Sequence, residues 1–408
     1  MTDYTELMGF LSVPRPNGSA AERKTLHALQ DWLTRHDIPF HTYIFRQYPY
    51  FFEAIGVWLI VSRTLLVLAF FLHLGWIALL IALLGLIGGT LDMLLHLPLV
   101  SWVGARQGEN ILIELEPFTG TVRREVILSA HYDSKTEPLD HHQRMCFLKN
   151  IPFGIVLTIL LGLLSPLDRF FWQQNSPWNH YTLGLGIGLS LALLILAWGM
   201  GLNLSLGRLI PQSRGAADNG SACAILLGLA EKLHEDHSRN TTLRETGLLD
   251  HTRVTLALFT GEEVDRQGSR AYALHRQEQG NSIPVIAIHL EAMAQDGDYV
   301  YWEQDGSIFR LRPTDESVSR LLIEAVQEIT GHSPLPGGPI TSDGASFIQI
   351  DIPTGVLGTY DRRWVTSGFH RPSDNLDRVV MDRLPEGVEI LYRIIQKYDQ
   401  EETGAQVS

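Results

Sequence analysis

Three long stretches of this chain contain no Asp, Glu, Lys or Arg, and they limit what it can fold into. They comprise residues 64–91, 150–167 and 181–207. The hydrocarbon core of a bilayer is about 30 Å thick, and an α-helix needs roughly 20 apolar residues to cross it. The run "YTLGLGIGLSLALLILAWGMGLNLSLG" (181–207) meets this requirement by itself, whereas a helix buried in a globular core usually carries a shorter run. We therefore predict a membrane-spanning helix there.

The first apolar stretch is too long for one upright helix and slightly short for two. Adding the segment "YFFEAIGVWLIVS" (50–62) makes room for two crossings, with a break near His73–Gly75. This interpretation puts Arg63 and Glu53 in or near the bilayer, where isolated charges are costly. Together with 150–167 and 181–207, the simplest arrangement is two transmembrane helical hairpins, which make four crossings.

The remaining sequence alternates between strand and helix patterns, which favours an α/β layered domain. Leu26, Leu29 and Leu33 share one face of a predicted helix, and Ser19 is its candidate N-cap. The predicted strands are 40–45, 110–116, 124–133, 253–263, 283–293 and 352–359. The predicted helices are 19–36, 315–330 and 385–400; residues 215–235 are predicted to be a loop leading into a helix, and a further helix is predicted to begin within 265–277.

Both apolar blocks interrupt this domain. Since the chain returns to the same domain after each block, each block crosses the membrane an even number of times or not at all. Basic residues flank the blocks on the catalytic side, at positions 46, 106, 149, 208 and 214, so the positive-inside rule favours a cytoplasmic catalytic domain in a multi-pass protein. The expected divisions are catalytic domain 1–49, 106–149 and 208–400, membrane inserts 50–105 and 150–207, and a flexible tail 401–408.

Composition excludes some classes of protein. The 408 residues carry 32 basic and 45 acidic side chains, a formal charge of −13, which argues against a nucleic-acid groove because such grooves need a basic stripe. Cys146 and Cys223 make no disulfide framework. The N-terminal segment lacks a basic region followed by an apolar core, so we expect no cleavable signal peptide.

Ionisable residues gather where the predicted strands end, which is where open α/β sheets bind ligands. His131 and Asp133 end one strand, Glu262 and Glu263 follow another, and Glu291 ends a third. Asp218 opens a helix and His370 lies in a loop. Imidazoles together with carboxylates are the ligands that Zn²⁺ uses, and a carboxylate that bridges two metals can help clamp one hydroxide. The pattern therefore predicts a zinc-type site, with Asp218 suited to bridge.

The adjacent Glu262 and Glu263 fit such a site. One of two neighbouring carboxylates can bind metal while the other holds the proton of an attacking water. Each residue also has a simpler interpretation: a strand-end His as a structural hydrogen-bonder, paired Glu as helix-dipole partners, and Asp218 as an N-cap. The ordered combination favours the metal site.

The motifs "AHYD", "GAADNGSA", "TGEEVDRQGSRAY", "HLEAM", "TSDGASF" and "FHRPSDNLD" stand in this order. In this respect the chain resembles the co-catalytic zinc aminopeptidase superfamily, which includes bacterial leucyl aminopeptidases, glutamate carboxypeptidase and glutaminyl cyclase. The resemblance covers most of the chain apart from the apolar inserts. It implies a zinc aminopeptidase-like α/β fold, with a mixed, mainly parallel sheet and helices on both faces.

By this resemblance, two Zn²⁺ ions would be held per chain. His131 would bind one and His370 the other, Asp218 would bridge them, and Glu263 would join His370. Glu262 would be the general base and Asp133 would orient His131. Glu291 stands where the family usually has Asp, so that ligand is one methylene longer here. Asp343 matches a family position to which we assign no role.

The resemblance implies a membrane-anchored, metal-dependent aminopeptidase acting on peptides with a free N-terminus through a metal-activated water. The unusual Glu291 admits an alternative, a single-zinc acyl-transfer enzyme of the glutaminyl cyclase kind. A third interpretation is a catalytically silent membrane scaffold. The expected partners are a peptide substrate and the lipid bilayer, with no nucleic acid, and the sequence sets no oligomeric state.

Overall fold

The computed structural model describes residues 2–117, 119–243, 249–280, 283–307, 310–362, 365 and 368–400, with side chains omitted at 238–243. The predicted tail 401–408 lies outside these residues. Contacts divide the chain into two units: a sheet unit of residues 1–47, 106–135 and 212–408, and a helical unit of residues 48–105 and 136–211. Residues 136–149, which we assigned to the catalytic domain, thus fall in the helical unit.

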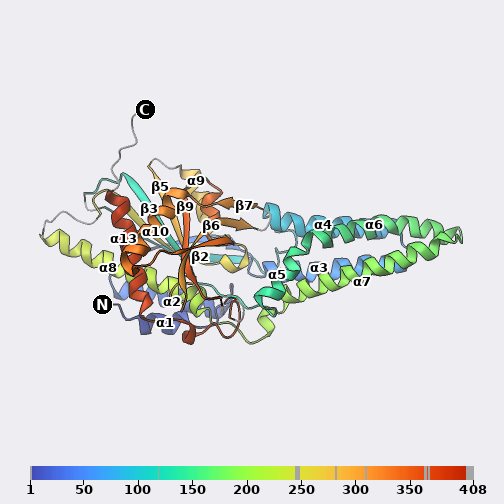
Figure 1. Ribbon diagram of the computed structural model, residues 1–408, viewed down its shortest axis with the longest axis horizontal. Helices are drawn as coiled ribbons and strands as arrows, with labels where there is room; N and C mark the ends of the chain where they lie inside the picture. The colour runs from blue at the N-terminus through green and yellow to red at the C-terminus, as the bar shows by residue number, and fades with distance from the viewer. Residues whose placement is uncertain are drawn as a thin grey trace, which may run out of the picture. The chain divides into compact units, whose positions relative to one another are not determined.

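The sheet unit contains a mixed sheet (Figure 1). Its strand order is β1-β2-β4-β3-β5-β9-β6-β7, and β8 also pairs with β6. The four central strands β4, β3, β5 and β9 pair in parallel, while β1 and β2 join antiparallel at one side. The described strands are β1 His41–Gln47, β2 Arg106–Leu115, β3 Arg124–His131, β4 Thr252–Phe259, β5 Val285–Glu291, β6 Asp298–Ser307, β7 Arg310–Pro313, β8 Leu335–Ile340 and β9 Thr354–Tyr360.

Helices cover both faces of this sheet, which confirms the predicted α/β class. Alternate residues of a strand point to opposite faces, so Val126 and Leu128 of β3 join one core while Ile127 joins the other. The first core packs against α1, α2, α8, α10 and α13, and the second against α9 and α11. The described helices are α1 Tyr4–Leu11, α2 Ala20–Arg35, α8 Ala222–Leu243, α9 Gln267–Gln279, α10 Glu316–Thr330, α11 Gly344–Ile348 and α13 Arg383–Gln400.

Several elements were not predicted, and their sequences explain why. β8 reads "LPGGPI", and Pro and Gly are normally depleted in strands. It nevertheless pairs in parallel with β6, as Pro can do at the edge of a sheet. The helix α1 and the strands β6 and β7 were also missed. By contrast, Ser19 caps α2 as expected, since its side chain accepts the Glu22 N–H.

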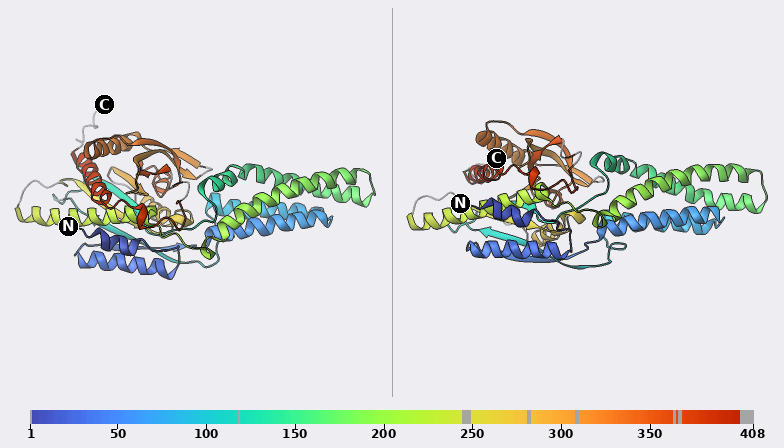
Figure 2. Two further views of the ribbon diagram at one scale, coloured as in Figure 1. Left: turned by 60° about the horizontal axis from the view of Figure 1, so that its bottom comes forward. Right: turned by 90° about the horizontal axis from the view of Figure 1, so that it is seen from below.

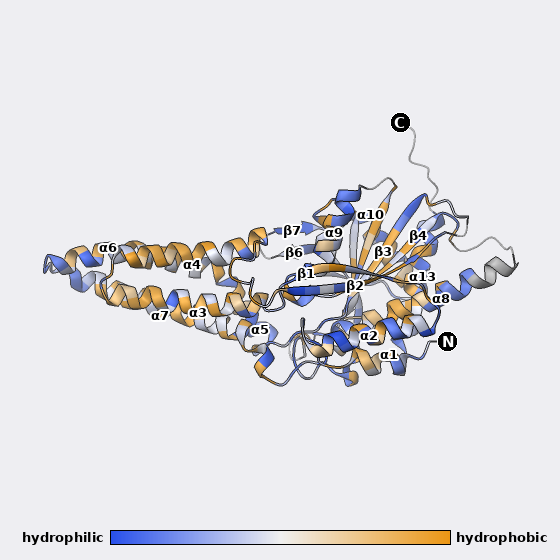
Figure 3. Cartoon of the chain, turned by 180° about the vertical axis from the view of Figure 1, so that it is seen from behind, coloured by the Kyte–Doolittle hydropathy of each residue, from blue (hydrophilic) through white to orange (hydrophobic). Residues whose placement is uncertain are grey.

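The helical unit contains four long apolar helices that pack side by side (Figures 1 and 2). Hydrophobic residues predominate along these helices (Figure 3), and by length and composition these four helices of the described chain could cross a membrane. The first break falls at residues 72–75, where the sequence predicted it. The described helices of this unit are α3 Phe51–Phe71, α4 Trp76–Leu95, α5 His141–Lys149, α6 Ile151–Gln173 and α7 Trp178–Ser205.

Small residues let these helices approach closely. A Cβ placed on Gly56 of α3 would lie 2.6 Å from the Gly201 carbonyl oxygen of α7, and such small-residue contacts are typical of membrane helices. The charged residues that seemed costly are buried or paired within the unit. Arg63 is 7% exposed and donates to Ser62 Oγ, and Glu53 pairs with Arg208 at 2.5 Å.

The two ends of the first insert lie next to each other in the sheet unit. Gln47, the last residue of β1, is the register partner of Arg106, the first residue of β2. The insert 48–105 therefore leaves and re-enters the sheet unit at adjacent positions of an antiparallel pair. This arrangement suits a hairpin that returns to the side from which it started.

The hairpin arrangement predicts opposite exposure of two surface positions. With the exposed Cys146 replaced by Ser, a Gln277→Cys variant in α9 and a Gln174→Cys variant after α6 each place a thiol at an exposed site. An impermeant thiol reagent added to sealed vesicles should label only one of them, because α6 and α7 carry residue 174 across the bilayer. Permeabilised vesicles, in which both should react, are the control. Labelling of both from the same side would contradict the four-crossing topology.

Candidate metal centre

Parallel pairing brings the predicted site residues to one edge of the sheet. β3 lies between β4 and β5, and its last residue His131 is the register partner of Phe259 in β4. Glu262 and Glu263 form a short turn of helix, Glu262–Val264, just after β4, and Glu291 is the last residue of β5. The carboxyl ends of these three strands therefore meet at one place, as expected for a ligand site in such a sheet.

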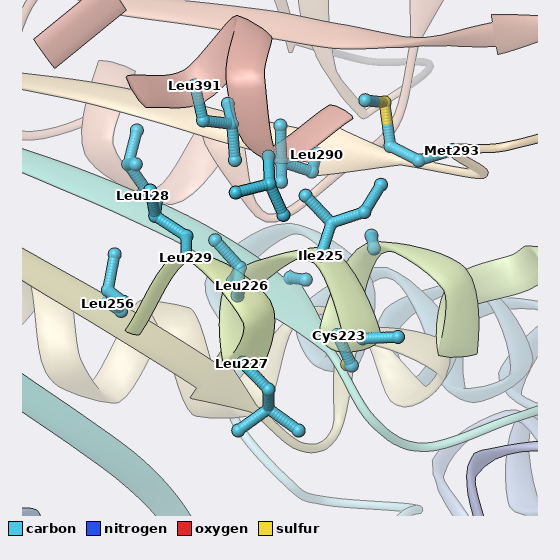
Figure 4. Packing of buried hydrophobic residues seen from close by; sticks show 14 of the residues in the cluster. Leu128, Cys223, Ile225, Leu226, Leu227, Leu229, Leu256, Leu290, Met293 and Leu391 are labelled. Atoms are coloured by element: carbon cyan, nitrogen blue, oxygen red, sulfur yellow. The ribbon is translucent and has the colours of Figure 1, made fainter. Parts of the chain in front are cut away.

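Asp218 enters the same place on an irregular turn that precedes α8. The buried face of α8 anchors this turn: Figure 4 shows Ile225 and Leu226 packed with Leu128 of β3 and Leu290 of β5. Cys223 Sγ donates to the His131 carbonyl oxygen at 3.1 Å, and the peptide bond Asp218–Asn219 is cis. The position of the carboxylate is thus set by core packing rather than by a flexible loop.

Two buried side chains that the sequence analysis did not single out fix this turn further. Arg15 is fully buried and donates to the carbonyl oxygens of Arg214 and Gly215, at 2.6 and 2.8 Å, and to that of Tyr132. It also donates to the carbonyl oxygens of residues 11 and 13. Arg15 therefore joins the chain just before the second insert to the chain just after it. Arg15 stands in the segment "VPRPNG", where no local pattern assigns it this role.

The second of these side chains is Asp374. Its two carboxylate oxygens accept the backbone N–H groups of Ala217 and Asp218, at 2.8 and 3.2 Å. It lies four residues after His370, so it connects the loop that carries His370 to the turn that carries Asp218. Burial raises the pKa of Asp374 to about 7, an effect that the charge of Asp218 reinforces and the two backbone N–H groups oppose.

The centre of the site is the Asp218 carboxylate, which lies between two imidazoles. Its Oδ1 is 3.3 Å from His131 Nε2, and its Oδ2 is 3.4 Å from His370 Nε2. Burial opposes the charged form of Asp218, but the two imidazoles outweigh burial and lower the pKa of this carboxyl. Each oxygen thus faces a different imidazole nitrogen, which is the arrangement that a bridging carboxylate would need.

The carboxylates of the paired glutamates face different imidazoles. Glu263 Oε2 lies 3.1 Å from His370 Nε2, and Glu262 Oε2 lies 3.9 Å from His131 Nε2. The Asp133 carboxylate accepts the backbone N–H groups of both glutamates, at 3.3 and 3.2 Å. Asp133 Oδ1 is also 3.6 Å from His131 Nδ1. Asp133 therefore organises the glutamate turn as well as the surroundings of His131.

Glu291 and Asp343 make their side-chain contacts with residues outside the imidazoles and carboxylates described above. Glu291 Oε2 lies 3.1 Å from Nε2 of His289, a buried histidine two residues earlier on β5. The sequence analysis passed over His289, because a histidine inside an apolar strand resembles an ordinary core residue. Asp343 is fully buried and its Oδ1 accepts from Ser269 Oγ at 2.5 Å. Burial raises its pKa to about 7.

The donor atoms at the centre fit a metal ion. His131 Nε2, Asp218 Oδ1 and Glu263 Oε1 are buried and have no hydrogen-bond partner among the residues that the structure describes. His131, Asp218 and Glu263 each offer one ligand atom, and these atoms lie within 4.8 Å of one another. Buried polar groups are normally satisfied, and an imidazole with two carboxylates is a donor set that Zn²⁺ accepts. A cation among these atoms would satisfy all three.

The charges of the buried carboxyl groups also favour a bound cation. Burial raises the pKa of Glu262 well above its usual range; the charge of His131 opposes this rise, while that of Glu263 adds to it. Burial likewise raises the pKa of Glu291 well above its usual range, and the charge of Asp218 adds to it. So many buried carboxyl groups cannot all ionise beside two imidazoles alone, whereas divalent cations reverse this electrostatic cost.

Comparison with known proteins agrees with this geometry. Residues 204–393 match the model of Peptidase family M28. The match covers somewhat less than half of the chain and includes Asp218, Glu262, Glu263, Glu291 and His370, but not His131. A search of curated proteins finds no match.

Solved structures show the same fold at low sequence identity. An aminopeptidase from Aneurinibacillus sp. strain AM-1 is 14% identical over 97% of this chain and 92% of that one, with a TM-score of 0.55. A glutaminyl cyclase from Fimbriiglobus ruber is 13% identical over 97% and 95%, with a TM-score of 0.52. This chain spans only half the length of a zinc aminopeptidase from Bacillus subtilis, with 72% of this chain covered, 14% identity and a TM-score of 0.42.

This chain thus shares the fold of the Aneurinibacillus aminopeptidase and the Fimbriiglobus ruber glutaminyl cyclase, and residues 204–393 match the model of Peptidase family M28. The resemblance to the co-catalytic zinc aminopeptidase superfamily is confirmed. The family match supports a metal-dependent, peptidase-like enzyme that binds zinc.

The burial of Arg15 predicts a large effect on stability. An Arg15→Ala variant would leave several buried carbonyl oxygens without a donor, and each such loss costs roughly 1–3 kcal/mol. We expect the free energy of unfolding of the sheet unit to fall by more than about 3 kcal/mol, measured by denaturant titration of the full chain in detergent. Arg23→Ala, at an exposed position of α2, is the matched control and should change it by less than about 0.5 kcal/mol. Equal stability of the two variants would contradict the role of Arg15.

Proposed function

We propose that this chain is a membrane-anchored, zinc-dependent aminopeptidase that hydrolyses the first peptide bond of a peptide with a free N-terminus. The observation that carries the proposal is the Asp218 carboxylate, with one oxygen toward each of two imidazoles and a second carboxylate, Glu262, beside them. Such a site suits two metal ions and one general base.

The chain's own residues divide the work of holding and reacting. His131, Asp218, Glu263, Glu291 and His370 would hold zinc, with Asp218 shared between two ions. Bound Zn²⁺ supplies Lewis acidity, which lowers the pKa of a water molecule and polarises a carbonyl. Glu262 Oε2 takes the proton of the attacking water and delivers it to the leaving amine. Asp133 keeps Glu262 and Glu263 in place through their backbone N–H groups.

The charge of the site favours a substrate that carries an amine. Asp133, Asp218, Glu262, Glu263 and Glu291 contribute more negative charge than two zinc ions neutralise. The free α-ammonium group of a peptide would be attracted to this residual charge, since like-signed groups in a low-dielectric site focus the field on an incoming ligand. This supports an exopeptidase that starts from the N-terminus.

Membrane anchorage is supported by the helical unit. Four described helices have the length and composition to cross a bilayer, and the first insert begins and ends at paired strand residues. Flanking basic residues favour a cytoplasmic position for the sheet unit. The substrate pool in this proposal is therefore peptides on the cytoplasmic side of a membrane.

A glutaminyl cyclase-like acyl transfer is the second candidate function. Glu291 favours it, because the longer side chain contacts His289 and lies outside the group of three residues whose ligand atoms lie within 4.8 Å of one another. The solved glutaminyl cyclase from Fimbriiglobus ruber has the same fold. In this alternative a single zinc ion would suffice.

Replacement of the general base separates binding from catalysis. Glu262→Gln removes the proton acceptor and keeps the size of the side chain, so it should lower kcat by about 10²–10⁴-fold with unchanged zinc content. Release of amino acids from peptides and elemental analysis of the same sample are the two measurements. Glu278→Gln, at an exposed position of α9, should leave both unchanged. Full turnover in Glu262→Gln would reject this mechanism.

Zinc content and substrate preference together distinguish the two candidate functions. We expect two equivalents of zinc per chain in detergent-purified protein, release of N-terminal residues from peptides, and loss of this activity with a chelator followed by recovery with added zinc. One equivalent together with cyclisation of N-terminal glutaminyl peptides would establish the cyclase alternative instead. Two equivalents of zinc per chain without either activity would contradict both candidate functions and would favour the catalytically silent scaffold.

A further inference from the structure

Four polar side chains lie on the neighbouring strands β3 and β5, two on each strand. Ser129 and His131 lie two residues apart on β3, and His289 and Glu291 lie two residues apart on β5. Residues two apart on a strand point to the same face, and Ser129 is the register partner of His289. His131 and Glu291, at the carboxyl ends of their strands, belong to the proposed centre, whereas Ser129 and His289 have no role in the mechanism above.

Ser129 and His289 make a continuous chain of contacts to Glu291. His289 is fully buried, with Nδ1 at 3.1 Å from Ser129 Oγ and Nε2 at 3.1 Å from Glu291 Oε2. When Glu291 is ionised, it can only accept, so the proton must reside on Nε2 and point at the carboxylate. Ser129 Oγ partners Nδ1, and the imidazole ring lies nearly parallel to that of His131, at 12° and 6.4 Å between centroids.

The backbone on both sides of Glu291 is held as well. Asn219, the residue after Asp218, donates from Nδ2 to the Leu290 carbonyl oxygen at 2.7 Å and accepts the Ala292 N–H at Oδ1 at 3.1 Å. The main chain of Glu291 is therefore tied to the turn that carries the central carboxylate. Only the side-chain torsions of Glu291 remain to be fixed, and Glu has one more of these than Asp.

We infer that His289 is the positioning residue that fixes the longer Glu291 side chain so that its other oxygen, Oε1, serves as the zinc ligand beside His131. A donor behind a ligating carboxylate orients it and raises metal affinity, and loss of such a partner typically costs 10–100-fold in affinity. His289 thereby compensates for the extra methylene. The inference rests on the two-metal centre of the proposed function.

The test is a zinc titration of the full chain in detergent against a competing chromophoric chelator, which reports both dissociation constants. Gln places its amide nitrogen near the position of His Nε2, whereas Asn places it near Nδ1. His289→Gln should therefore bind both zinc ions within about threefold of the native affinities. His289→Asn and His289→Ala should weaken one of the two ions by about 10–100-fold and leave the other unchanged. His332→Ala, at an exposed position, is the control for loss of a histidine.

The outcomes separate this inference from the proposed function. Native affinity for both ions in His289→Asn, or equal weakening in His289→Gln and His289→Asn, would overturn the role of His289. If His289→Ala fails to fold, the comparison of Gln with Asn still decides. A native chain that binds one ion only would overturn the inference, and a native chain that binds two ions but releases no amino acid would reject the aminopeptidase while leaving the role of His289 intact.

Discussion

The structure of the site depends on one buried carboxylate, Asp218, that faces two imidazoles. His131 comes from the end of β3 and His370 from a loop near the C-terminus, so neither is close to Asp218 in sequence. Each oxygen of the carboxylate lies within 3.4 Å of a different ring nitrogen. Asp218 Oδ1 and its neighbour His131 Nε2 have no hydrogen-bond partner in the described chain, and a cation between them would satisfy both.

Much of the sheet unit serves to hold that carboxylate in place. Arg15 ties the segment before the second insert to the segment after it, and Asp374 ties the His370 loop to the Asp218 turn. Asn219 ties the same turn to the end of β5. These contacts explain how the chain tolerates a long apolar insert between two parts of one site: the ends of the insert are fixed by buried side chains of the sheet unit.

The residues that could be predicted from sequence are those whose chemistry is visible in short motifs at strand ends. Glu262 and Glu263 stand side by side after an apolar run, and the period of that run predicts the strand. The helix over 181–207 could be predicted from its length and lack of charge alone, whereas α3, which carries Glu53 and Arg63, was predicted only by adding residues 50–62 to the first apolar stretch. His289, Arg15 and Asp374 were not readable in this way. Each acts through partners more than 100 residues away or through a register that only the folded sheet defines.

The sequence by itself determined which ionisable side chains stand at the strand ends and the alternation of strands and helices, because side-chain type and hydrophobic period are local properties. It also determined that two apolar blocks interrupt one domain. Only the tertiary structure decided which oxygen faces which imidazole, that Asp133 holds the glutamate turn, and that a buried histidine lies behind the unusual Glu291. These are properties of strand register and of long-range packing, which a linear pattern does not contain.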